Sequence, residues 1–352
     1  MDEGTTAVTP DGLTLVDECL DRFFRLAAHR AAAFGRPAAD LVRVLQQASC
    51  GGKQFRPRMV LVAYGGLGGR DMRAAAHVAA AYELLHTALV VHDDVIDRDW
   101  SRRGVPNVAG SFRDDATTGG IPIPTAEHRG TSAAVIAGDL ALAGAPRLIE
   151  SSGADGDRRS RLLEILDDAV FASAAGEMTD VDLAMGPMPT VEEILAMERA
   201  KTSVYSFEAP LQSGAVLAGA PETVVAALGV FGREVGIAYQ IVDDVLGVFG
   251  NEATTGKTAV GDIREGKRTV LIAHAATTEH WFAIEPFLGN RDLTDDQAEH
   301  VRLRLVCSGA RDLAQDLIER HAALAAAALA ELPDELRARL GALVTELVDR
   351  VR

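Results

Sequence analysis

Apolar residues recur at intervals of three and four positions through most of the chain, which is the spacing of one face of an α-helix. The spacing predicts helices over about 12–34, 38–49, 54–67, 71–98, 130–150, 157–184, 190–201, 203–219 and 222–249, with four more after residue 267. No stretch alternates between apolar and polar residues as a half-buried strand does. The pattern therefore predicts an all-α fold.

Glycine, proline and small polar residues separate the predicted helices, as in "GGLGGRD" at 65–71 and "GPMPT" at 186–190. The longest region without clear periodicity is 99–129, which predicts a lid or binding loop, with disorder as the alternative. No low-complexity linker divides the chain. We therefore expect a single domain over residues 1–352, with residues 1–11 as a flexible tail.

Composition and charge narrow the possible partners. Hydrophobic residues make up 48% of the chain, enough for a sizeable core, and a net charge of −16 argues against nonspecific binding to nucleic acid or to an anionic membrane. The 3 cysteines are too few and too scattered for a disulfide framework or a zinc site, so we expect them to be buried apolar residues.

The location of the protein can also be predicted from these patterns. The first residues carry no secretory or transit signal. Glu83, His86, His92 and nearby aspartates interrupt the most apolar stretch, so we expect no membrane span. Together these features predict a cytoplasmic protein.

A cluster of aspartates ends that apolar stretch, in "VHDDVIDR" at 91–98. In a helix, Asp93 and Asp97 lie one turn apart on the same face, while Asp94 lies about 100° round the axis. Carboxylates so close repel one another unless a cation compensates them. An acidic, solvated helix end is one explanation, and a Mg²⁺ site, favoured over zinc by the all-oxygen ligands, is the other.

A second aspartate pair favours the metal site. "YQIVDDVLGVFG" at 239–250 places Asp243 and Asp244 in another apolar helix. Mg²⁺ ions bind few carboxylates and bridge to substrate phosphates, so the two clusters predict a diphosphate ligand. Cations in "GGKQFRP" at 51–57, "RRG" at 102–104, "KT" at 201–202, "GK" at 256–257 and "REGKR" at 264–268 support this prediction.

Taken in order, these motifs resemble those of trans-isoprenyl diphosphate synthases, the polyprenyl synthetase family, and are most like those of a geranylgeranyl diphosphate synthase. The resemblance runs from about Gly51 to Arg268 and includes "GEMTD" at 176–180. It implies an antiparallel helix bundle around a deep central cavity, as a homodimer. It also implies a Mg²⁺-dependent prenyltransferase that joins isopentenyl diphosphate head-to-tail to dimethylallyl, geranyl or farnesyl diphosphate.

The resemblance also implies roles for individual residues, carried over motif by motif. About three Mg²⁺ ions would be bound by Asp93, Asp97 and Asp243, with Asp94 and Asp244 in support. The allylic diphosphate would be bound by Arg102, Lys201, Lys257 and, in an auxiliary role, Lys267. Isopentenyl diphosphate would be bound by Lys53, Arg56, His86 and Arg103, and the reacting carbons would face Thr202 and Gln240. Glu177 and Asp180 would line the site or serve only the structure.

Two positions depart from the commonest family pattern. Gln54 replaces a basic residue in the first motif, and Gly247 replaces the last aspartate of the second cluster. Asp243 is therefore expected to be the principal metal ligand on that helix.

Residues before the first aspartates are expected to set the product length. Farnesyl-forming members commonly place an aromatic side chain four or five residues before this cluster, where the chain has Leu89 and Ala88. Deeper on the helix come Leu85, Tyr82 and Ala81, and the 12 residues from Ala81 to Asp93 span ~18 Å. We therefore expect geranylgeranyl diphosphate, with Tyr82 and Leu85 as the floor; farnesyl or longer products are the alternatives.

Two rival functions are less consistent with the motifs. A class I terpene cyclase typically carries a serine and a glutamate after the second aspartate pair, where this chain has Gly247 and Asn251. A non-catalytic partner subunit would generally lose aspartates, whereas this chain keeps both clusters.

Overall fold

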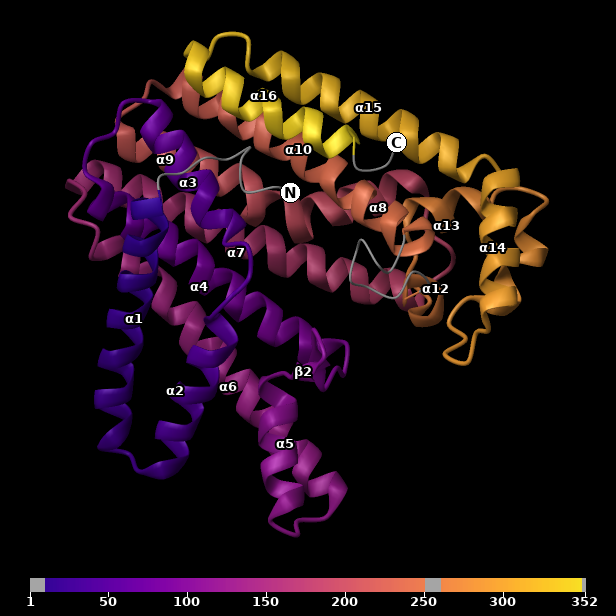
Figure 1. Ribbon diagram of the computed structural model, residues 1–352, viewed down its shortest axis with the longest axis horizontal. Coiled ribbons are helices and arrows are strands. Elements are labelled where there is room, and N and C mark those ends of the chain that lie inside the picture. The colour runs from indigo at the N-terminus through magenta and orange to yellow at the C-terminus, as the bar shows by residue number, and fades with distance from the viewer. Residues whose placement is uncertain (1–9, 251–260, 350–352) are drawn as a thin grey trace. The chain divides into compact units, whose positions relative to one another are not determined.

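The computed structural model describes residues 10–250 and 261–349, and nearly all of them are helical (Figure 1). The all-α prediction is confirmed. The chain divides into two compact units, which we describe separately. The amino-terminal unit runs to Leu166 and includes Ser213–Ala220; the carboxy-terminal unit comprises Asp167–Gln212 and continues from Pro221.

The amino-terminal unit is built around one buried helix, α4. Its elements are α1 (Pro10–Ala32), α2 (Arg36–Ser49), α3 (Phe55–Gly66), α4 (Met72–Ile96), β1 (Ser101–Arg102), β2 (Val105–Pro106), α5 (Val108–Thr118), α6 (Ile123–Glu150) and the start of α7 (Gly156–Met185). Helices α1, α3 and α6 pack on α4. The side chain of Asp71 caps α4 by accepting hydrogen bonds from the N–H groups of Arg73 and Ala74, both at 3.1 Å. The apolar face that the sequence predicts is therefore the core.

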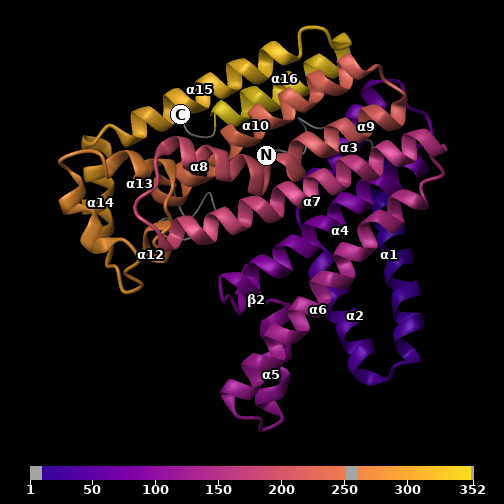
Figure 2. The ribbon, with the colours of Figure 1, turned by 180° about the vertical axis from the view of Figure 1, so that it is seen from behind.

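The carboxy-terminal unit is organised around α10. After the rest of α7 come α8 (Val191–Glu198), η1 (Arg199–Glu208), the start of α9 (Ala209–Ala218), α10 (Glu222–Phe249), α12 (Gly261–Glu265), α13 (Val270–Ala275), the short 3₁₀ turns η2 (Trp281–Ala283) and η3 (Glu285–Phe287), α14 (Asp295–Cys307), α15 (Ala310–Ala328) and α16 (Asp334–Asp349). Helices α15 and α16 lie side by side along α10 in both ribbon views (Figures 1 and 2). The four α-helices predicted after residue 267 are α13 to α16.

The prediction of a loop over 99–129 is wrong. The segment forms the hairpin β1–β2, helix α5 and the start of α6. Asn107 begins α5 by accepting a hydrogen bond from Gly110 N–H at 2.8 Å, and Val108, Phe112 and Ala116 are buried at helical spacing. This apolar stripe covers only three turns, so it was too short to stand out as periodicity.

The predicted break between the helices at 190–201 and 203–219 is also wrong. Helices α8 and α9 are joined by η1, ten residues of π-helix that contain Lys201 and Thr202. Glycines let neighbouring backbones approach η1: a Cβ on Gly176 of α7 would lie 2.6 Å from Lys201 Cα, and one on Gly236 of α10 would lie 2.6 Å from Ser203 Cβ. The wider π-helical turns of η1 therefore occur where α7 and α10 pack closely against it. The local sequence does not reveal these contacts.

Two smaller expectations also need correction. Residues 1–9 of the predicted tail lie outside the described residues, but α1 already begins at Pro10. Cys50 and Cys307 are exposed and Cys19 is partly exposed, so the cysteines are not the buried residues that we expected.

Length and composition alone would allow three described helices to cross a membrane, namely α4, α6 and α10. Of their most apolar windows, 78%, 50% and 56%, respectively, is buried inside the protein. We expected the charged residues of α4 to exclude a membrane span. By length and composition they are too few to do so. Burial identifies α4 as a core helix, whereas α6 keeps a substantial exposed face.

Candidate functional site

The first aspartate cluster lies at the carboxyl end of α4, and its members differ in exposure. Asp94 is buried, the side chain of Asp93 is 26% exposed, and Asp97 is exposed at the residue that ends the helix. The N–H of Asp97 donates to the carbonyl of Asp93 at 2.8 Å, which keeps both residues within one helical turn. Asp93 and Asp97 thus have the accessibility that metal ligands need, and Asp94 has a supporting position.

Arg102 of β1 neutralises the two adjacent aspartates. Its Nη2 lies 2.7 Å from Asp94 Oδ1 and 3.2 Å from Asp93 Oδ2. Burial raises the pKa of Asp94, and the hydrogen bond from Arg102 partly opposes this effect. The predicted diphosphate-binding arginine is therefore paired with the predicted metal-binding cluster.

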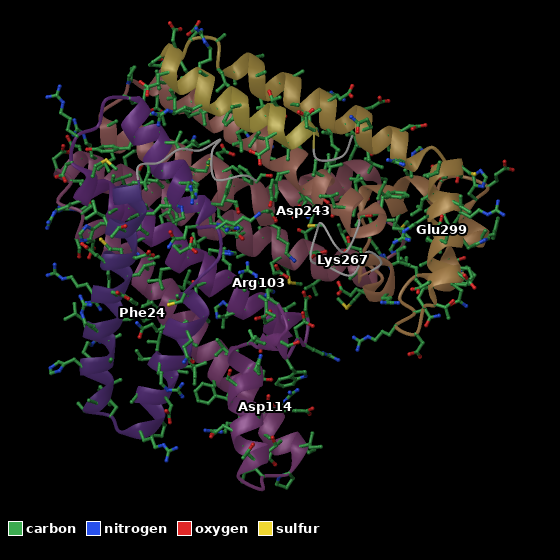
Figure 3. The ribbon with its side chains drawn as sticks, viewed as in Figure 1. Phe24, Arg103, Asp114, Asp243, Lys267 and Glu299 are labelled. Atoms are coloured by element: carbon green, nitrogen blue, oxygen red, sulfur yellow. The ribbon has the colours of Figure 1, made fainter. Side chains whose placement is uncertain are left out.

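Arg103 follows Arg102 and stands in the turn of the hairpin. The two turn residues, Arg103 and Gly104, both have positive φ angles, 54° and 77°, as in a two-residue type I′ turn. A Cβ on Gly52 would lie 3.5 Å from Arg103 Nη1, so the arginine reaches the glycine motif before α3. Figure 3 labels Arg103 at this turn. Two predicted anion-binding motifs therefore meet in the amino-terminal unit.

The segment before α3 has an unusual backbone. Gly51, Gly52 and Gln54 have φ angles of 87°, 82° and 45°, and Arg58 Nε donates to the carbonyl of Lys53 at 3.0 Å. Gln54 Nε2 donates to Asp17 Oδ1 of α1 at 2.5 Å. The residue that departs from the family pattern thus connects α1 to α3, while Lys53 remains exposed.

His86, Arg56 and the hairpin arginines share one electrostatic environment. Burial lowers the pKa of His86 well below its usual value, and Arg56, Arg102 and Arg103 lower it further. His86 is therefore neutral at physiological pH and can donate or accept a hydrogen bond. The structure brings together three of the four residues predicted to bind isopentenyl diphosphate.

Glu83, which the sequence did not identify as functional, lies three residues before His86 on α4. It is 6% exposed, and its Oε2 has no hydrogen-bond partner among the described residues. Burial raises its pKa to about 7, an effect opposed by Arg56 and Arg103 and strengthened by Asp17. Its position three residues before His86 was the only available sequence signal.

The second aspartate cluster lies on α10 in the carboxy-terminal unit. Asp243, labelled in Figure 3, is half-buried, and Asp244 is 5% exposed. Gln240 Nε2 lies 3.4 Å from Asp244 Oδ1. Burial raises the pKa of Asp244 to about 7; burial, together with the neighbouring Asp244, raises the pKa of Glu198 well above its usual value. Sequence reasoning missed Glu198, which has no motif around it.

Lys201 is held by the "GEMTD" motif of α7. Its Nζ lies 2.7 Å from Asp180 Oδ2 and 3.0 Å from Glu177 Oε2. Thr202, the next residue of η1, is half-buried. Glu177 and Asp180 therefore form the ion pairs that position Lys201.

Of the two remaining lysines predicted to bind the allylic diphosphate, the structure describes only Lys267. Lys267 Nζ lies 3.3 Å from Asp262 Oδ1 and 3.5 Å from Glu265 Oε2, and Figure 3 labels it in the carboxy-terminal unit. Lys257 lies outside the described residues.

The donor groups fit Mg²⁺, although no protein-only cage is formed. Within residues 10–250 and 261–349, no group of three or more His, Cys, Asp and Glu side chains is placed to hold a metal ion. Mg²⁺ usually binds one or two carboxylates and completes its octahedron with water and substrate phosphates. Pairs of aspartates beside arginine or lysine match that requirement.

The positions predicted to set product length are packed inside the amino-terminal unit. Ala81, Tyr82, Leu85 and Ala88 have 0% exposure, whereas Leu89 is partly exposed. Tyr82 Oη and Ser213 Oγ are 2.7 Å apart, so the phenol is fixed. A chain growing past Leu89 would reach Ala88 only if neighbouring side chains move.

Comparisons with known proteins agree with these features. Residues 39–302 match the family described as polyprenyl synthetase. The geranylfarnesyl diphosphate synthase of Aeropyrum pernix is 32% identical, over 86% of this chain and 91% of its own. The geranylgeranyl diphosphate synthase of Saccharolobus solfataricus is 31% identical, over 83% and 85%. A crystal structure of geranylgeranyl pyrophosphate synthase from Corynebacterium glutamicum, complexed with isoprenyl diphosphate and magnesium, superposes with a TM-score of 0.88 and 29% identity, covering 99% of this chain and 100% of that one.

Proposed function

The chain belongs to the polyprenyl synthetase family and is a prenyltransferase with the all-α isoprenoid synthase fold, and we propose that its product is geranylgeranyl diphosphate. In this proposal it condenses isopentenyl diphosphate with allylic diphosphates, head-to-tail, until the chain has 20 carbons. The observation that carries the proposal is that Arg102, which acts electrostatically on His86 together with Arg56 and Arg103, also pairs with Asp93 and Asp94 at the end of α4.

Charge stabilisation is the main catalytic requirement of this reaction. Bound Mg²⁺ would stabilise the negative charge that gathers on the departing diphosphate. Asp93, Asp97 and Asp243 would hold the ions, supported by Asp94 and Asp244. Arg102, Lys201, Lys257 and Lys267 would bind the allylic diphosphate.

The second substrate would be bound by the corner at the start of α3. Lys53, Arg56 and Arg103 would pair with the diphosphate of isopentenyl diphosphate, and neutral His86 would add a hydrogen bond. Thr202 and Gln240 would face the reacting carbons. The released diphosphate would accept the proton, so the protein needs no nucleophile of its own. Apolar walls would exclude water from the carbocation.

Side chains of α4 would set the product length. Tyr82, fixed by Ser213, and Leu85 would form the floor, and the small Ala88 side chain would let a chain longer than farnesyl pass once the neighbouring side chains move. The named relatives include synthases for products of 20 and 25 carbons, so the longer product is the principal alternative.

We also propose a homodimer that is cytoplasmic and has no membrane span. Val135, Ile136 and Leu140 of α6 are 41%, 52% and 46% exposed. Apolar side chains grouped on one helix face are typical of a protein interface. A second copy of the chain would cover this face.

The decisive experiment supplies Mg²⁺, isopentenyl diphosphate and, in separate reactions, dimethylallyl, geranyl or farnesyl diphosphate. Mass spectrometry of the products should show linear diphosphates that end at 20 carbons. A 25-carbon end point would correct the product length. A cyclic hydrocarbon would instead identify a cyclase, and absence of turnover with every substrate would contradict the enzymatic proposal.

A further inference from the structure

The second aspartate cluster ends in Gly247, and the space beside this glycine is occupied. A Cβ built on Gly247 would lie 2.8 Å from Asp262 Cγ and would overlap Asp262 Oδ2. The carboxylate of Asp262 therefore takes the place of a side chain at position 247. Any other residue at 247 would displace it.

Asp262 reaches this position from a different element. Gly247 lies in the last turns of α10, and Asp262 is the second residue of α12, which packs on α10. Two contacts with Lys267 fix Asp262: its carbonyl accepts from Lys267 N–H at 2.9 Å, and its Oδ1 lies 3.3 Å from Lys267 Nζ. The side chain is 17% exposed, so the carboxylate is mostly withdrawn from water.

The spacing on α10 places the Asp262 carboxylate one turn from Asp243. Asp243 and residue 247 are separated by four positions, so they lie one turn apart on the same helix face. Asp93 and Asp97 have the same separation on α4. A carboxylate beside Gly247 therefore stands where the second ligand of an i, i+4 pair would stand.

Asp244 provides an independent sign that the cluster is built for a ligand. It is 5% exposed, and its Oδ2 accepts no hydrogen bond from the part of the chain that the structure describes. Asp262 is close enough to act on it electrostatically. A cation bound among these carboxylates would compensate their mutual repulsion.

We propose that Asp262 supplies the third carboxylate of the second aspartate cluster, in place of the aspartate that Gly247 replaces. It acts with Asp243 in holding Mg²⁺ against the diphosphate. This inference rests on the proposed function, because it requires the cluster to bind a metal diphosphate.

A carboxylate exchange between the two positions tests the inference. We would measure binding of Mn²⁺ in the presence of inorganic pyrophosphate, by electron paramagnetic resonance, for the full chain and for Asp262→Ala, Gly247→Ala, Gly247→Asp/Asp262→Ala and Asp243→Ala. The matched control is Asp312→Ala, which removes an exposed aspartate from α15. Thermal unfolding of each variant verifies the fold.

Asp262→Ala should weaken Mn²⁺ binding by about 10- to 100-fold. The double variant should recover to within a few-fold of the wild type, because it returns a carboxylate to the same place. Gly247→Ala should also weaken binding, although it removes no carboxylate, because its methyl group displaces Asp262. Asp312→Ala should bind as the wild type does.

Two results would overturn the inference while leaving the proposed function intact. One is wild-type binding by Asp262→Ala when Asp243→Ala has lost it. The other is weakened binding by Asp262→Ala that the double variant does not restore, because Asp262 would then have only a structural part. If Asp243→Ala also binds Mn²⁺ as the wild type does, the second aspartate cluster binds no metal diphosphate. Both the inference about Asp262 and the proposed role of this cluster would then be wrong.

Discussion

At the scale of single residues, the burial of Glu83 should make the free energy of unfolding depend on pH. Its pKa is raised from 4.5 to about 7, chiefly by burial. A carboxyl with a raised pKa in the folded state contributes stability below pH 4.5 and loses it as the pH rises through about 7. From pH 4.5 to 8, this residue alone should lower the free energy of unfolding by about 3 kcal/mol.

Glu83→Gln removes this titration while keeping the size of the side chain. Between pH 5 and 8 the wild type should lose unfolding free energy as Glu83 ionises, whereas the variant should not. The variant should therefore become more stable relative to the wild type as the pH increases. Urea unfolding at several pH values measures it. Glu164→Gln, at an exposed site, is the control and should follow the wild type. Parallel profiles for wild type and Glu83→Gln would contradict the assignment.

The same scale shows what sequence can and cannot predict about the site. The separation of Asp93 and Asp97 is a local property of helix geometry, so it was predictable. The carboxylate of Asp262 beside Gly247 was not, because it depends on the packing of two elements. Gln54 was predicted to have lost a charge, but its contact with Asp17 needed the fold.

At the scale of the element, α4 combines the proposed metal-binding aspartates at its carboxyl end with a packed interior. Ala88 lies five residues before Asp93 and has 0% exposure. Ala88→Phe should shorten the main product from 20 to 15 carbons, because an aromatic ring would block the path along the helix. Mass spectrometry of the products measures the change.

Ala88→Ser is the matched control and should leave the product unchanged. Because overpacking a core costs about 1–3 kcal/mol, thermal unfolding must show that Ala88→Phe remains folded. A folded Ala88→Phe enzyme that still makes the wild-type product would exclude Ala88 from the control of chain length.

Long helices were predicted well because their apolar stripes repeat over many turns, as in α4 and α10. The sequence failed at α5, whose stripe is short, and at η1, whose hydrogen-bonding pattern depends on neighbouring helices. These failures share a physical cause. Local spacing determines a helix only when enough turns contribute to its buried face.

At the scale of the whole molecule, the exposed face of α6 has two possible explanations. Its length and composition would allow a membrane span, yet half of its most apolar window is buried in the protein. If a second copy covers Val135, Ile136 and Leu140, then Ile136→Glu should convert dimers to monomers. Light scattering after size exclusion measures the mass.

Leu324→Glu, which places the same charge at a 46% exposed leucine of α15, should leave the dimer intact. Flotation of the wild type with liposomes tests the membrane alternative. A monomeric wild type, or a dimeric Ile136→Glu variant, would exclude this face as the dimer interface.

The π-helical segment η1 also affects how this chain should be compared with its relatives. A π-turn holds one more residue than an α-turn, as though a single residue had been inserted into a continuous helix. A relative that is α-helical throughout this region would need a one-residue gap between Glu198 and Ala209. If the gap were placed on the wrong side of Lys201, the alignment would match Lys201 with a residue of the relative that does not occupy the same place in the fold.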